Sequence, residues 1–209
     1  MMAHPLQALL DSHPLVAILR GIRPEEAVDV AEVLLASGFR CIEVPLNSPS
    51  PLESLNRLAA KLGDQMILGA GTVLNAMQVD EVVQAGAKWV LAPNCNRSMI
   101  ERAVDRGLLV MPGVATPTEA FDALDAGAQA LKLFPADVLG PGSLKAWRAV
   151  LPEHTPMWVV GGVDETNLAL FRQAGARGAG LGSALYKPGI PLAKLEQRAQ
   201  LLQAAWSGR

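Results

Sequence analysis

Short apolar runs alternate with longer amphipathic segments along the whole chain. The segments between the runs place apolar residues at helical spacing, as in PEEAVDVAEVLLAS at 24–37. The runs themselves contain few polar residues, as expected for strands that are buried on both faces. The pattern predicts eight strands, at 15–19, 41–45, 66–70, 88–92, 108–112, 130–134, 157–161 and 178–182.

Glycine marks the end of most of the helical segments. Glycine favours the left-handed conformation that terminates a helix, so each of these residues predicts a helix end before the next strand. The glycines are Gly38, Gly63, Gly86, Gly107, Gly127 and Gly175. The intervals between neighbouring glycines are 25, 23, 21, 20 and 48 residues, and the last interval is about twice as long as the others. One unit therefore has the length of one short helix plus one strand.

Regular alternation of helix and strand predicts a parallel sheet with right-handed crossovers. Eight such strands close a (β/α)8 barrel, an α/β fold in which residues 1–209 form a single domain. The competing architecture is a doubly wound open sheet, which normally interrupts the repeat at a switch point. No G-x-G-x-x-G follows the first strand, and GAGTVL at 69–74 lacks the third glycine of that motif.

Composition argues against a nucleic-acid-binding, a membrane-spanning or a secreted protein. The chain has 18 basic and 20 acidic residues, a net charge of -2 and no long run of one sign, which argues against a nucleic-acid partner. No run of 18 apolar residues is free of charge and proline, so no membrane span is expected. The N-terminus lacks the basic region of a signal peptide. Cys41 and Cys95 are far apart in the sequence, which favours reduced thiols and a cytoplasmic location.

The carboxyl ends of barrel strands, with the loops after them, form the active site of this fold. Lys132 is the most unusual residue there, because it interrupts the apolar run ALKLFPA at 130–136. A lysine in an apolar pocket has a lowered pKa, and its neutral amine can attack a carbonyl group to form a Schiff base. The alternative is a surface lysine whose alkyl chain reaches along the protein to water. Lys88, by contrast, lies at the start of its strand.

Glu43 is a carboxylate near the end of the apolar strand at 41–45. It could be a structural partner for Arg20 or Lys132, because buried charges need partners. It could also be a general acid or base close to a Schiff base. The two interpretations are compatible.

The loops after the last two strands are rich in glycine. In this fold they frequently bind phosphate, because glycine lets backbone N–H groups approach an anion closely. Gly161 and Gly162 follow one strand and Ser183, which adds a hydroxyl group, follows the other. The three histidines, His4, His13 and His154, precede strands and do not follow them. No set of residues has the spacing of metal ligands, so no metal is expected. A serine nucleophile likewise has no histidine base.

Seven segments together resemble the class I aldolases that cleave 2-keto-3-deoxy-6-phospho sugar acids. They occur in order along nearly the whole chain and cover seven of the eight predicted strand ends: VAILRG, IEVPLNSP, GAGTVL, APN, LKLFPA, VVGGV and GLGSALY. The resemblance implies a homotrimer of barrels without a cofactor or metal. It also implies that Lys132 forms the Schiff base and Glu43 transfers protons.

The resemblance assigns the remaining site residues to the two halves of the substrate. Arg20 and Thr72 would hold the pyruvate half, and Pro93 and Phe134 would shape its pocket. The 6-phosphate would be bound by two glycines and a serine: Gly161, Gly162 and Ser183.

Two substrate series that differ at C4 occur in this family. Gluconate-series members usually have Thr-Leu-Arg after the glutamate and a threonine before the paired glycines. This chain has Pro45, Leu46 and Asn47 in the first place and Val160 in the second. The resemblance therefore favours the galactonate series, with the gluconate epimer, or both, as the alternative. A phosphosugar isomerase or epimerase and a non-catalytic phosphosugar-binding barrel are more distant alternatives, because fold does not determine function.

Overall fold

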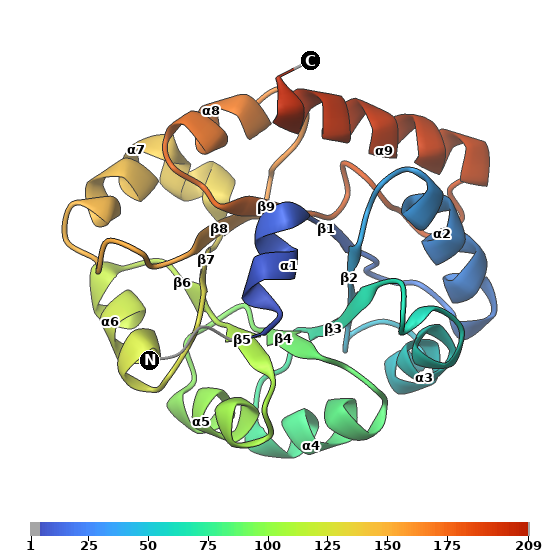
Figure 1. Ribbon diagram of the computed structural model, residues 1–209, viewed down its shortest axis with the longest axis horizontal. Coiled ribbons are helices and arrows are strands. Elements are labelled where there is room, and N and C mark those ends of the chain that lie inside the picture. The colour runs from blue at the N-terminus through green and yellow to red at the C-terminus, as the bar shows by residue number, and fades with distance from the viewer. Residues whose placement is uncertain (1–4, 209) are drawn as a thin grey trace.

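The computed structural model describes residues 5–208, which form a parallel β-barrel surrounded by helices (Figure 1). The strands are β1 (Leu15–Ile18), β2 (Cys41–Pro45), β3 (Ile67–Gly71), β4 (Trp89–Leu91), β5 (Leu109–Met111), β6 (Gly113–Val114), β7 (Leu131–Leu133), β8 (Met157–Val160) and β9 (Gly178–Leu181). The helices are α1 (Gln7–Ser12), α2 (Pro24–Ala36), α3 (Pro51–Leu62), α4 (Ala76–Gln84), α5 (Arg97–Asp105), α6 (Pro117–Asp125), α7 (Ala136–Arg148), α8 (Leu168–Gln173) and α9 (Leu192–Ser207).

The fifth barrel strand is divided in two at Pro112. All neighbouring strands are parallel, in the order β5-β4-β3-β2-β1-β9-β8-β7-β6. β5 pairs with β4, whereas β6 pairs with β7, where Gly113 lies opposite Lys132. Pro112 has no N–H to donate, but its carbonyl accepts a hydrogen bond from the Lys132 N–H at 2.9 Å. The two halves together close the sheet, so the predicted (β/α)8 barrel is confirmed.

Apolar side chains fill the barrel interior and the layer between the strands and the helices. The inner cluster contains two large aromatic residues, Trp89 and Trp158, which are almost completely buried. Glycine on the adjacent strand makes room for each indole, because a Cβ atom at Gly69 or Gly178 would overlap it. The inner cluster therefore closes the barrel below its carboxyl end.

Helix α1 was not marked by the sequence pattern. It precedes the first strand and lies across the barrel opening (Figure 1). Leu10 of α1 is fully buried and belongs to the inner cluster. This helix therefore covers the amino-terminal end of the barrel.

The predicted left-handed glycines are confirmed at five helix ends. Their φ angles are positive, between 72° and 100°, at Gly38, Gly86, Gly107, Gly127 and Gly175. The prediction is wrong for Gly63, whose φ of -58° is helical. A Cβ atom there would meet the Ala59 carbonyl oxygen at 2.6 Å, so the residue is limited by space and not by a left-handed backbone.

None of the helices within the described part of the chain combines the length and the apolarity that crossing a bilayer requires.

Candidate active site

Lys132 points into the barrel from the middle of β7. Its neighbours Leu131 and Leu133 belong to the outer apolar layer, so strand alternation turns the lysine inward. The side chain is only 5% exposed, and its Nζ lies 4.8 Å from the centre of the Phe134 ring. Burial lowers the pKa of Lys132; the Glu43 carboxylate opposes this shift, and the charge of Arg20 adds to it. The surface-lysine alternative therefore does not describe this residue.

Glu43 is buried in the same interior, on β2. It is 1% exposed, and its Oε2 has no hydrogen-bond partner among the described residues. Burial raises the pKa of Glu43, and the charges of Lys132 and Arg20 act in the opposite direction. Within residues 5–208 no cation approaches its carboxylate to the distance of an ion pair. Glu43 is therefore a titratable group close to Lys132, and its carboxyl group is not engaged in a structural ion pair.

Gly71 on β3 provides the space for the Glu43 carboxyl group. A Cβ atom at Gly71 would overlap this group. We expect Gly71→Ala to destabilise the protein by about 1–3 kcal/mol, the usual cost of overpacking a close-packed interior. Urea denaturation of the purified variant measures this change.

A matched control is Gly142→Ala in α7, where nothing lies within 4 Å of the added carbon and φ is not left-handed. That substitution is expected to be neutral or to stabilise by ~0.5–1 kcal/mol, because alanine is the better helix former. The double variant Gly71→Ala, Glu43→Ala should recover part of the lost stability, because the two side chains compete for one space. Equal stability of Gly71→Ala and the wild type would show that the carboxyl group lies elsewhere.

Arg20, Thr72 and Pro93 lie at the carboxyl ends of β1, β3 and β4. Arg20 is exposed, and its Nη1 donates a hydrogen bond to Asn47 Oδ1 at 2.6 Å. Thr72 has a φ of +56°, a left-handed conformation that is strained for a β-branched residue. Such strain persists where the surrounding structure imposes it, and it occurs often at binding sites. Pro93 is half-buried at the same end of the barrel.

The two glycine-rich loops expose unused backbone donors. Gly161 and Gly162 have φ angles of +96° and +63°. The N–H groups of Gly161, Gly162, Gly182 and Ser183 find no acceptor among the residues that the structure describes. Converging free N–H groups in loops of this kind bind anions.

Asn167, which the sequence pattern did not mark, holds the first of these loops. Its Nδ2 donates to the Gly162 carbonyl at 2.8 Å, and its Oδ1 accepts from the Asp164 N–H at 3.0 Å. The only sign of Asn167 in the sequence was the polar run DETN at 164–167, and such runs are common in loops that have no role in a site. Asn167 fixes the carbonyl side of the loop and leaves the N–H groups free.

Phe134 and Val160 lie between the lysine and these loops. Phe134 follows β7, and its ring is 3.3 Å from the position of a Cβ atom on Gly161. Val160 is 6% exposed at the end of β8, beside Gly180 of β9. Strand pairing places Trp158 opposite Lys132, so Val160 is the next inward residue toward the rim. The sequence-predicted residues thus lie together at one end of the barrel.

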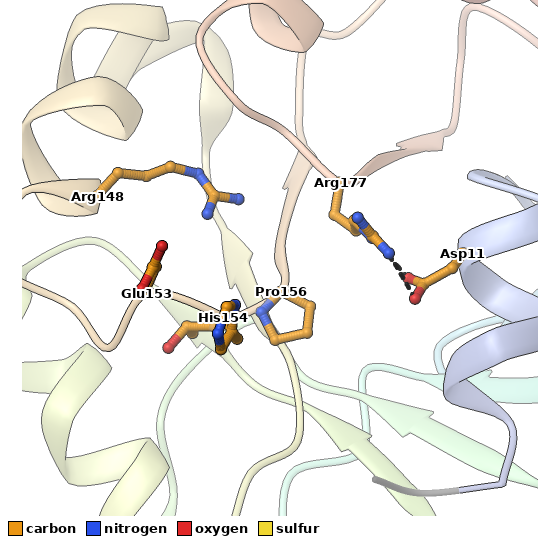
Figure 2. Close-up of a pocket in the computed structure, with 7 residues that line it drawn as sticks. Asp11, Arg148, Glu153, His154, Pro156 and Arg177 are labelled. Carbon is orange, nitrogen blue, oxygen red and sulfur yellow. Dashed lines mark hydrogen bonds and ion pairs between the residues drawn. The ribbon is translucent and has the colours of Figure 1, made fainter.

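A separate hollow of about 310 Å³ lies at the other end of the barrel (Figure 2). It is lined by residues that precede strands: Asp11, Arg148, Glu153, His154, Thr155, Pro156 and Arg177. Arg177 forms an ion pair with Asp11 at 2.6 Å, and Arg148 donates from Nε to the Gly175 carbonyl at 2.9 Å. These contacts join α1 and α7 to the loop before β9. The lining of this hollow therefore has contacts that hold neighbouring elements together.

Within residues 5–208, no group of three histidine, cysteine, aspartate or glutamate side chains is arranged to hold a metal ion. His13 ends α1 and His154 lies in the loop before β8, whereas His4 lies outside the described residues.

A sequence model of the KDPG and KHG aldolase family matches residues 6–197 of this chain. The chain belongs to this family. The match covers every strand of the barrel and both glycine-rich loops.

Individual relatives of the family agree with this assignment. The chain is 46% identical over 193 residues to the 2-dehydro-3-deoxy-6-phosphogalactonate aldolase of Escherichia coli (strain K12), which covers 92% of this chain and 94% of that protein. It is 31% identical over 144 residues to the KHG/KDPG aldolase of the same organism, covering 69% and 66%. A solved structure described as native KDPGal superposes with a TM-score of 0.92 at 45% identity, covering 93% of this chain and 95% of that one.

Proposed function

We propose that this chain is a class I aldolase that cleaves 2-dehydro-3-deoxy-6-phosphogalactonate to pyruvate and D-glyceraldehyde 3-phosphate. The observation that carries the proposal is Lys132, an amine that is 5% exposed and lies close to the Glu43 carboxyl group, which is 1% exposed. The names of the relatives that share 46% identity supply the substrate. The 6-phosphogluconate epimer is the alternative substrate, supported by relatives at 31% identity.

Binding would place the two ends of the substrate on opposite sides of Lys132. The positive charge of Arg20 and the hydroxyl group of Thr72 would hold the carboxylate next to the ketone. Pro93 and Phe134 would enclose the pyruvate half. The phosphate would accept hydrogen bonds from the free N–H groups of Gly161, Gly162 and Ser183.

The covalent step begins when the neutral amine of Lys132 attacks the C2 carbonyl. Loss of water gives a protonated imine, which draws electrons from the bond between C3 and C4. A base removes the proton of the C4 hydroxyl group, that bond breaks, and glyceraldehyde 3-phosphate leaves. The bonding electrons remain on the pyruvate portion as an enamine on Lys132.

Glu43 would supply the proton that completes the cycle. Its raised pKa allows the carboxyl group to carry a proton at a higher pH than an exposed glutamate does. Protonation of the enamine at C3 gives the pyruvate imine, and water hydrolyses it to pyruvate and free Lys132. The imine itself is the electron sink, so the proposed reaction needs no metal or other cofactor.

Trapping with pyruvate and borohydride tests the proposal. Reduction of an imine leaves a stable adduct that intact mass spectrometry detects, and peptide mapping should place it on Lys132. An isomerase, an epimerase or a phosphosugar-binding protein gains no adduct. Absence of an adduct at saturating pyruvate would therefore exclude the aldolase.

The rate of trapping is expected to depend on pH with a shifted midpoint. The amine reacts only when it is unprotonated, so the rate rises with pH through the pKa of Lys132. Burial lowers this pKa from the ordinary value of 10.5, and the midpoint should therefore fall below that value. Initial trapping rates from pH 6 to 11, compared with those of N-acetyl-lysine amide, measure the midpoint. Identical midpoints would contradict the buried position of the amine.

Val160 is expected to contribute to the choice between the C4 epimers. Its side chain is apolar and lies between Lys132 and the phosphate loop, where the substrate hydroxyl at C4 would lie. An apolar wall distinguishes related substrates by only ~1–3 kcal/mol. Val160→Thr adds a hydroxyl group and should raise the relative kcat/KM for the gluconate epimer about tenfold, the equivalent of one hydrogen bond.

The measurement is the ratio of cleavage rates on the two epimeric phosphates, with Val163→Thr, in the loop that follows β8, as the control substitution. An unchanged ratio in an active Val160→Thr enzyme would direct attention to Asn47, which faces Arg20.

We also propose a homotrimer in the cytoplasm, without a membrane or nucleic-acid partner. Support comes from exposed apolar side chains that follow the carboxyl ends of β3, β6 and β7: Leu74, Met77, Phe121 and Val138. Exposed apolar side chains that lie together on a surface often mark contacts between subunits, whereas scattered ones are ordinary. Light scattering after size-exclusion chromatography would give the mass of the assembly.

A further inference from the structure

The loop that carries Arg20 is fastened to the loop after β2 by two adjacent side chains. Arg20 Nη1 donates to Asn47 Oδ1 at 2.6 Å. The next residue along the chain, Gly21, donates its N–H to Ser48 Oγ at 2.9 Å. One asparagine and one serine thus contact the side chain of the arginine and the backbone beside it.

Ser48 is a rigid anchor for this contact. It is 8% exposed, and its own N–H donates to the Pro45 carbonyl at 3.0 Å at the end of β2. Gly21 has no freedom on its other side, because a Cβ atom there would lie 2.8 Å from Pro188 Cγ. The backbone next to Arg20 therefore has a fixed position relative to the strand that carries Glu43.

Asn47 fixes the guanidinium without neutralising it. Among residues 5–208, Arg20 forms no ion pair with a carboxylate. The amide oxygen of Asn47 is a neutral acceptor, so the positive charge stays available for a substrate anion. Arginine loses much rotamer entropy when it is held in one conformation, and a fixed guanidinium binds a carboxylate with less further loss.

We infer that Asn47 and Ser48 are positioning residues that hold Arg20 ready for the carboxylate of the substrate. The inference rests on the carboxylate-binding role of Arg20 under the proposed function. It assigns Asn47 an effect on the pyruvate half of the substrate, which both epimers share.

The test compares borohydride trapping of pyruvate with that of pyruvamide, a neutral compound of similar size. The ratio of the two rates reports recognition of the carboxylate and cancels effects on Lys132 itself. Arg20→Met should bring the ratio close to that of the free reagents. Asn47→Ala should lower it about tenfold, the worth of one ordinary hydrogen bond, and Ser48→Ala should lower it less.

Two further variants separate geometry from charge. Asn47→Asp keeps an acceptor beside the guanidinium but adds a competing carboxylate, so the ratio should fall as in Asn47→Ala. Ser48→Thr keeps the hydroxyl group and should retain the wild-type ratio. Asn96→Ala, which loses the N-terminal cap of α5, is the structural control and should leave the ratio unchanged.

The double variant Arg20→Met, Asn47→Ala should be no worse than Arg20→Met alone, because the asparagine acts through the arginine. A wild-type ratio in Asn47→Ala, together with a lowered ratio in Arg20→Met, would overturn the positioning role only. A wild-type ratio in Arg20→Met would instead overturn the role of Arg20 and this inference with it. Loss of trapping in the wild type would remove the proposed function as a whole.

Discussion

Replacing Lys132 with methionine is expected to abolish trapping of pyruvate and to lower turnover by ~10⁴-fold or more, because covalent catalysis loses its nucleophile. Methionine has a similar length and suits the apolar surroundings of β7, where the lysine is 5% exposed. The folded barrel should therefore survive the change. Steady-state cleavage and intact mass after borohydride treatment measure the two effects.

Lys88→Met is the matched control. Lys88 is exposed and lies just before β4, at the other end of the barrel. It should keep both the adduct and the turnover of the wild type. An adduct that persists in Lys132→Met, or disappears in Lys88→Met, would move the imine to another amine such as Lys145.

The fold could be predicted from the sequence because the repeat is local. Most units end in a glycine and enter an apolar run, and both signals come from neighbouring residues. The division of the fifth strand at Pro112 is different. It depends on β5 pairing with β4 while β6 pairs with β7, which are contacts across the barrel. The run LLVMPG at 108–113 contains the proline but not the identity of its partners.

Alternation along a strand turns Lys132 and Glu43 to the face opposite that of their apolar neighbours, but it does not say which of the two faces lies inside the barrel. The sequence therefore left both an inward and a surface orientation open for Lys132. The space for the Glu43 carboxyl group results from Gly71 on a third strand, which has no side chain there.

The contacts between loops were the part of the site that was hardest to predict from the sequence. Asn47 and Ser48 contact Arg20 and Gly21 across 27 positions of sequence. Asn167 contacts Gly162 within five residues, yet its polar segment resembles an ordinary exposed turn. The positions of such side chains depend on how neighbouring loops pack, which the apolar pattern does not describe. The left-handed Thr72 is a similar case, because threonine rarely adopts that conformation without tertiary contacts.

Glu43→Gln is expected to separate formation of the imine from the proton transfers that follow. Glutamine keeps the size of the side chain beside Gly71 but cannot exchange a proton. General acid–base catalysis typically contributes ~10²–10⁴-fold, so turnover should fall by that amount while pyruvate is still trapped on Lys132. The Glu43 carboxylate raises the pKa of Lys132, so its removal should also move the pH midpoint of trapping to a lower value.

Glu53→Gln on α3 is the control, because Glu53 is an exposed partner of Arg57. It should change neither turnover nor the midpoint.

The two readouts of Glu43→Gln give different information about the buried carboxyl group. A lower midpoint with a change of less than about threefold in turnover would mean that Glu43 sets the charge of the lysine but transfers no proton. A large fall in turnover with an intact adduct would place Glu43 after the imine, at cleavage of the C3–C4 bond or protonation of the enamine. Exchange of the methyl protons of pyruvate with solvent deuterium, followed by NMR, then distinguishes these two steps, because exchange requires removal of a C3 proton from the imine and deuteration of the enamine but no cleavage of the C3–C4 bond.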